Sequence, residues 1–192
     1  TLRRSSAASD VYKRQHKMYG PKGIGALVIR EGFPLEPSQY GGGQELGLRS
    51  GTLPVPLIVG FAKAVEITKN DQDERNKRLL FFRNLLLSGL KKNISGLIVN
   101  GSIDQRLPHN LNITFPGVKG SQLHGQLRRF IFCTSGSACS NGEASHVLQE
   151  IGLSKKDAEA SIRMSIGRNT TEKDINKACL LYTSPSPRDL ST

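Results

Sequence analysis

Long apolar runs are missing from this sequence of 192 residues. No stretch approaches the roughly 20 apolar residues that a helix needs to cross a bilayer, so we expect no transmembrane segment and no membrane partner. The first residues also lack the apolar core of a secretory signal. Cysteine is scarce, with only Cys133, Cys139 and Cys179. This small odd number argues against a disulfide framework and predicts a reducing, cytoplasmic compartment.

A concentrated basic run is also missing, although the net charge is +11. Four basic side chains against one acidic side chain lie in residues 1–15. The remaining excess is spread over loops and predicted helix faces. A nucleic-acid-binding domain usually gathers such charge into one stripe, so we expect no direct nucleic-acid partner.

The two ends of the chain, residues 1–15 and 179–192, show neither helical nor strand periodicity. The second of them is rich in serine and proline. We interpret both as tails of non-native sequence and leave them out of the fold prediction.

Between the tails, helical and strand patterns alternate without an internal repeat, which predicts an α/β or α+β fold. Strands are expected at 25–30, 97–100, 111–115 and 162–166, and helices at 55–69, 71–92, 121–129 and 143–151. Capping patterns at Ser154 with Asp157 and at Thr171 with Asp174 predict two further helix starts.

A lysine stands beside a glycine- and proline-rich turn in the stretch HKMYGPKGIGAL (16–27). A solvated surface lysine is the ordinary interpretation of Lys17. The functional alternative is a Schiff-base lysine, which must reach a cofactor carbonyl from a sterically open turn where its pKa can fall.

Small residues surround Cys139 in the stretch CTSGSACSNG (133–142). A structural cysteine is normally buried among aliphatic side chains, so this composition favours an exposed, mobile nucleophile. A metal site is the alternative, with Cys133, Cys139, His124 and His146 as ligands. No C-x-x-C or H-x-x-x-H pair supports it.

An arginine, Arg163, lies on the alternating stretch SIRMSI (161–166). An isolated arginine is usually a surface group. On an alternating strand it can instead point inward, where its forked guanidinium binds a carboxylate with two hydrogen bonds.

Together and in this order, these features resemble the group I (NifS/IscS-type) cysteine desulfurases, which are class-V aminotransferases. The resemblance extends from His16 to Ala178 and is carried by four stretches: HKMYGPKGIGAL (16–27), GGGQELGLRSGT (41–52), SGSACSNG (135–142) and SIRMSIGRNTTEKDI (161–175). It implies the C-terminal portion of a fold-type I transferase. Residues 16–60 would end the large cofactor domain and form a dimer-contact segment, and residues 61–178 would form an α+β small domain that carries the cysteine loop.

The resemblance also implies residue roles. Lys17 would carry pyridoxal 5′-phosphate as a Schiff base and shuttle the Cα proton, with His16 beside the cofactor. Thr52 would reach the cofactor phosphate of the second subunit in a homodimer. Arg163 would hold the carboxylate of L-cysteine. Cys139 would take up the sulfur as a persulfide. It would pass the sulfur to an iron–sulfur scaffold or another acceptor protein, for cluster assembly or tRNA thiolation. The same cysteine could transiently bind a [2Fe–2S] unit.

The sequence departs from the family pattern upstream of His16, where Arg14 stands in place of a serine of the cofactor pocket. Family members also carry a histidine, an aspartate and a glutamine around the cofactor ring that residues 1–15 do not supply. We therefore expect this chain alone to be inactive. The alternatives are another fold-type I enzyme, such as a selenocysteine lyase or an aminotransferase, and a basic binding module without catalysis.

Overall fold

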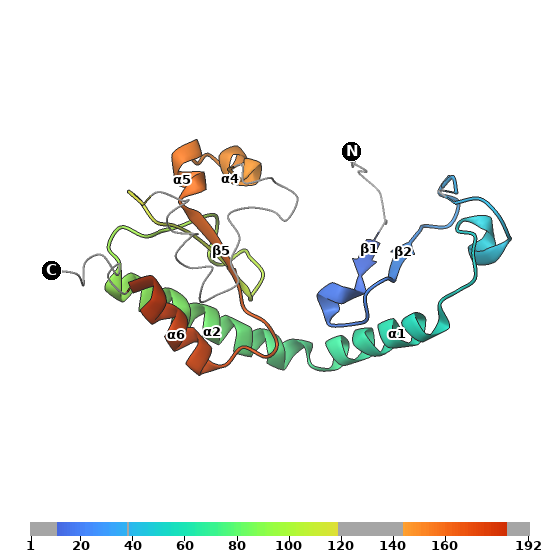
Figure 1. Cartoon of the computed structure of the whole chain (residues 1–192), viewed down its shortest axis with the longest axis horizontal. Helices are drawn as coiled ribbons and strands as arrows, with labels where there is room; N and C mark the ends of the chain where they lie inside the picture. Colours follow the sequence, from blue (N-terminus) through green and yellow to red (C-terminus); the bar gives the residue numbers. More distant parts are fainter. Residues whose placement is uncertain (1–10, 38, 119–143, 184–192) are drawn as a thin grey trace. The chain divides into compact units, whose positions relative to one another are not determined.

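The computed structural model describes residues 11–37, 39–118 and 144–183. The chain forms two compact units, Thr1–Gln72 and Asp73–Thr192, and each is considered by itself. Figure 1 shows the elements of both units along the chain. Within the described ranges, no helix is both long enough and apolar enough to cross a membrane.

The first unit combines a two-stranded antiparallel ribbon with one long helix. Strand β1 (Val11–Arg14) pairs with β2 (Gly25–Val28), and the short 3-10 helix η1 (Gln15–Met18) follows β1 directly. A second short helix, η2 (Gln44–Gly47), precedes α1 (Val55–Asn70). Pro56 lies in the first turn of α1, where a missing backbone N–H is tolerated.

The second unit is a three-stranded antiparallel sheet packed on helices. The strand order is β3 (Ile98–Val99), β4 (Asn110–Thr114), β5 (Ser161–Ser165). Helix α2 (Gln72–Asn93) precedes the sheet, α4 (His146–Glu150) and α5 (Lys155–Glu159) lie between β4 and β5, and α6 (Glu172–Thr183) follows β5. This is the α+β arrangement predicted for the small domain.

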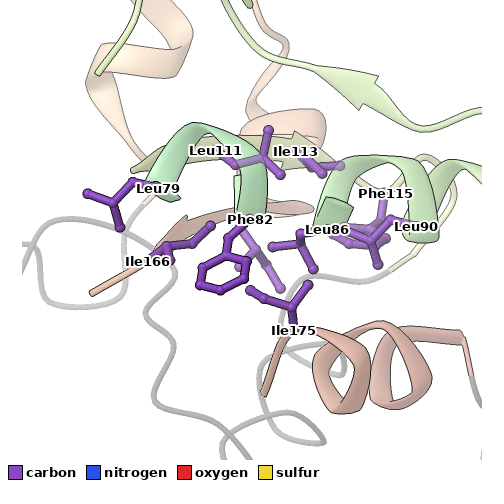
Figure 2. Close-up of a cluster of buried hydrophobic side chains, with 10 residues drawn as sticks. Leu79, Phe82, Leu86, Leu90, Leu111, Ile113, Phe115, Ile166 and Ile175 are labelled. Atoms are coloured by element: carbon purple, nitrogen blue, oxygen red, sulfur yellow. The ribbon is translucent and has the colours of Figure 1, made fainter. Parts of the chain in front are cut away.

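Helix α2 supplies one side of the core of this unit (Figure 2). Its buried apolar residues recur at spacings of three and four, which place them on one helix face: Leu79, Phe82, Leu86 and Leu90. Alternate residues of β4 and β5 face them, namely Leu111, Ile113 and Ile162. Each fully buried leucine or isoleucine contributes roughly 1.5–3 kcal/mol relative to exposure, so this cluster is the main source of stability of the unit.

Both predicted capping boxes are present. Ser154 Oγ accepts a hydrogen bond from the backbone N–H of Asp157 at 3.1 Å, at the start of α5. At the start of α6, the backbone N–H of Thr171 donates to Asp174 Oδ2 at 2.9 Å, and the N–H of Asp174 donates back to Thr171 Oγ1 at 3.3 Å. Local sequence therefore fixes where these two helices begin.

Regular structure extends into both segments that we expected to be irregular. Residues 11–14 form β1, because pairing with β2 satisfies backbone groups that periodicity alone does not reveal. Helix α6 continues past residue 178 to Thr183, since Cys179 packs against α2. The first compact unit extends to Gln72, and its helix α1 packs against η1. The helix expected at 121–129 lies outside the described residues.

Candidate active site

The turn that carries Lys17 is held in place by α1. Tyr19, directly after η1, adopts a left-handed backbone conformation with a φ of 62°. Pro21 packs so closely on Gly60 of α1 that a β-carbon on that glycine would lie 2.8 Å from Pro21 Cγ. A β-carbon on Gly23 would lie 3.6 Å from Leu57 Cδ1 of the same helix. The backbone of the turn is therefore fixed while the Lys17 side chain remains exposed.

The glycine-rich loop before α1 is closed by its own polar groups. Ser50 Oγ donates a hydrogen bond to Gly42 O at 2.7 Å, and the N–H of Gly51 donates to Gln44 Oε1 at 3.1 Å. Gly51 itself has a φ of 109°, a conformation that other residues rarely adopt. These contacts present the exposed side chain of Thr52 at the end of the loop.

Two adjacent non-glycine residues in this loop are also in the left-handed region, Glu45 with a φ of 52° and Leu46 with a φ of 57°. Leu46 is 96% exposed. Left-handed non-glycine residues are uncommon and cluster at functional sites and contact loops. Nothing in the sequence pattern predicted this geometry.

Arg163 lies on the face of the sheet that is turned away from the α2 core. Ile162, its neighbour on β5, is fully buried in the core, and strand alternation sends the Arg163 side chain to the opposite side, where it is exposed. Arg163 therefore lies outside the α2 core, on the sheet face that also carries its cross-strand partner Asn112. The reason is that α2 covers the other face of the strand.

A buried polar network lies on the same sheet face as Arg163. Asn100 Nδ2 donates to Ser161 Oγ at 3.2 Å and to Asn112 Oδ1 at 2.7 Å, and Thr114 Oγ1 donates to Asn100 Oδ1 at 2.9 Å. Ser161 Oγ donates to the backbone carbonyl of Asp157 at 2.6 Å. This network was not predicted, although the alternate polar residues at 110, 112 and 114 indicate a polar strand face.

The proposed sulfur carrier, Cys139, lies outside the described residues, as do Cys133 and His124. Cys179 is partly buried, and its thiol lies 3.8 Å from the carbonyl oxygen of Leu86, to which it donates. Burial raises the pKa of the Cys179 thiol, so it is a poor nucleophile at neutral pH.

Of the four ligands considered for a metal site, only His146 lies within the described residues. His146 is exposed at the start of α4. Within the described ranges, no group of three or more histidine, cysteine or acidic residues could hold a metal ion.

The sequence-predicted cofactor residues Lys17 and Thr52 both belong to the first unit, and His16 belongs to the same short helix as Lys17. The His16 side chain is outside the described part of the structure. The predicted substrate-binding residue, Arg163, lies in the second unit.

Comparison with known proteins agrees with these motifs. Cysteine desulfurase IscS of Vibrio vulnificus (strain YJ016) is 47% identical over 167 residues, which are 85% of this chain and 41% of that protein. A solved NifS-like protein is 36% identical with a TM-score of 0.77, covering 88% of this chain and 43% of the other. The structure titled SspA in complex with cysteine is 37% identical with a TM-score of 0.58, covering 79% and 42%.

The chain spans about two fifths of the length of the curated relatives that it matches. The predicted resemblance to the NifS/IscS group and the predicted fold are both confirmed. Residues 10–178, most of the sequence, match the Aminotransferase class-V family. The chain belongs to the class-V aminotransferase family.

Proposed function

We propose that this chain is part of a cysteine desulfurase, which uses pyridoxal 5′-phosphate to remove sulfur from L-cysteine and yields L-alanine and a persulfide on Cys139. The observation that carries the proposal is the exposed Lys17 amine on a turn whose backbone is fixed by α1. The similarity of the chain to IscS cysteine desulfurases and to a relative solved with cysteine favours L-cysteine over other substrates of the family.

The residues of the first unit fit the cofactor. The Lys17 amine makes no hydrogen bond or ion pair within the described residues, so it is free to condense with an aldehyde. The Thr52 hydroxyl, presented after Gly51, is a donor suited to a phosphate oxygen. When bound, pyridoxal phosphate supplies an electron sink for the negative charge that develops at the substrate Cα.

The protein side chains supply binding, proton transfer and nucleophilic attack. Arg163 would hold the substrate carboxylate with its guanidinium, and Lys17 would move the Cα proton. The Cys139 thiolate would attack the substrate sulfur. The C–S bond then breaks, the sulfur stays on Cys139 as a persulfide, and the carbon takes a proton to become the methyl group of alanine.

The assembly around this chemistry is part of the same proposal. A homodimer is supported by the exposed, left-handed Leu46, which lies six residues before Thr52 in the same loop and offers an apolar contact. A sulfur acceptor is needed because the persulfide must be discharged before the next turnover. For an IscS-like protein, an iron–sulfur scaffold suits that role. Cys139 would then contact a [2Fe–2S] unit transiently. A reducing cytoplasm suits a mechanism that depends on a free thiol.

The proposal is tested in a full-length chimera, in which residues 16–178 replace the matching segment of the Vibrio vulnificus relative. Cys139→Ser should keep the visible absorbance of the bound cofactor while sulfide release from L-cysteine falls at least about a hundred-fold, because serine cannot form a persulfide. Cys133→Ser is the matched control and should retain most of the activity. Normal sulfide release by the Cys139→Ser enzyme would refute the assignment.

A further inference from the structure

Asn112 is the direct cross-strand partner of Arg163 in the β4–β5 ladder. Paired residues on antiparallel strands project to the same face with their β-carbons roughly 4.5–5.5 Å apart. On the opposite face, Leu111, Ile113 and Ile162 are completely buried in the core. Asn112 and Arg163 therefore stand side by side on the polar face of the sheet.

The orientation of the Asn112 amide is set by the buried network beneath it. Its Oδ1 accepts the hydrogen bond from Asn100 Nδ2, and the backbone N–H of Asn100 donates to Asn112 O at 2.9 Å. Asn100 is in turn held by Thr114 and Ser161, which are 0% and 2% exposed. With its oxygen engaged, the amide presents Nδ2, a group with two donors and no acceptor.

Neither of the two neighbouring donor groups has a partner within the described part of the chain. Arg163 makes no hydrogen bond or ion pair there, and Asn112 Nδ2 donates to no group. A forked guanidinium beside an amide N–H₂ offers only donors, in a partly open position on a rigid sheet. This combination suits a small anion with several lone pairs and disfavours a cation.

We propose that Asn112 is a second ligand of the substrate carboxylate, acting together with Arg163. A carboxylate offers about four acceptor positions on its two oxygens. The guanidinium of Arg163 occupies two of them in a bidentate pair, and Asn112 Nδ2 donates to a third. The inference rests on the proposed function, because it takes Arg163 as the residue that binds the carboxylate of L-cysteine.

The test uses Asn112→Asp in the full-length chimera. An aspartate keeps the oxygen that accepts from Asn100, so the buried network can persist, but it replaces the donor by a negatively charged acceptor. The KM for L-cysteine should rise about ten-fold to a hundred-fold, since a hydrogen bond to a charged group is lost and repulsion is added. The kcat should change much less. Binding of L-alanine, followed by the absorbance of the cofactor, should weaken by a similar factor.

Three comparisons make the result specific. Cysteamine, which lacks the carboxylate, should bind the parent and the Asn112→Asp enzyme within about two-fold of each other. Asn110→Asp places the same charge on the same face two residues away, roughly 7 Å along the strand, and should raise the KM less than about three-fold. Asn112→Ala removes the donor without adding charge and should weaken L-alanine binding about five-fold to ten-fold.

The possible failures are distinguishable. If Arg163→Ala weakens L-alanine binding while Asn112→Asp and Asn112→Ala both bind it like the parent, the role of Asn112 is refuted and the proposed function survives. If Arg163→Ala leaves L-alanine and L-cysteine binding unchanged, the carboxylate assignment of the proposed function itself is refuted. Equal weakening of cysteamine and L-alanine by Asn112→Asp would also refute the inference, because it would indicate a general structural defect.

Discussion

At the scale of single residues, the approach of α6 to α2 depends on Gly89. A β-carbon at this position would lie 2.5 Å from Cys179 Sγ and 3.4 Å from Cys179 Cβ. The first distance is far inside van der Waals contact and the second is ordinary. The close contact therefore involves one sulfur atom and not the backbone of α6, which Figure 1 shows running beside α2.

We predict that Gly89→Ala destabilises the chain by roughly 1–3 kcal/mol through overpacking, in spite of the higher helix propensity of alanine. The double variant Gly89→Ala with Cys179→Ala removes the sulfur and should recover most of that loss, which makes the two changes strongly non-additive. Urea unfolding of the four proteins in the cycle measures this.

The matched control is Ser88→Ala, an exposed position on the same helix, which should stay within about 0.5 kcal/mol of the parent. Additive effects of the Gly89 and Cys179 substitutions would show that the two helices do not meet at this point.

At the scale of elements, helix α6 starts with a capping box whose acidic member responds to pH. Hydrogen bonds from the Thr171 hydroxyl and backbone N–H lower the pKa of Asp174 from its ordinary value of 3.8. A depressed folded-state pKa means that the charged form favours folding. The contribution is therefore complete above the unfolded-state value and is lost as the pH falls through the lower folded-state value.

We predict that the urea midpoint of the parent falls more steeply below about pH 4 than that of Asp174→Asn, whose amide does not titrate. At pH 6 the parent should be the more stable of the two, because only it carries the charge next to the helix N-terminus. Midpoints measured from pH 6 to pH 2.5 test this. Parallel pH profiles for the two proteins would mean that Asp174 does not contribute as described.

The sequence predicted the elements that depend on local interactions and missed those that depend on distant ones. Helix α2 and the caps at Ser154 and Thr171 were predicted, since their patterns repeat within a few residues. Strand β1 was missed because it exists only through its partner β2.

The candidate site shows the same division. Its lysine turn and glycine loop are contiguous motifs, so Lys17 could be singled out from its turn, and the resemblance to the desulfurase family indicated Thr52. The face on which Arg163 lies could not be deduced, because it depends on which side of β5 the distant helix α2 covers. Asn112 was missed for a related reason, since its role appears only when three strands place Asn100, Thr114 and Arg163 around it.

At the scale of the whole molecule, the response of polyanion binding to salt distinguishes an enzyme with a basic surface from a basic binding module. The sequence carries 27 basic residues against 16 acidic ones. Such an excess attracts polyanions at low salt without any dedicated site, and that attraction falls steeply as the salt concentration rises.

We predict weak binding of a 20-base-pair DNA duplex at 20 mM salt, without sequence preference, and a dissociation constant no tighter than about 100 µM at 150 mM salt. Fluorescence anisotropy of a labelled duplex measures both conditions. A lysozyme of similar charge sign is a suitable control for unspecific attraction. Submicromolar binding at 150 mM salt would favour the binding-module interpretation over the enzyme.

The contact between Pro21 and Gly60 has a consequence for genetics. Pro21 is a rigid ring, so any side chain at Gly60 must displace the turn that carries Lys17 and not merely a flexible side-chain tip. In a library of variants scored by survival on a sulfur-dependent medium, Gly60 should tolerate almost no replacement, although it lies on a helix and has no chemical group to offer. A harmful substitution at Gly60 would be mistaken for a folding defect of α1, although the damage would be a displacement of Lys17 away from the cofactor.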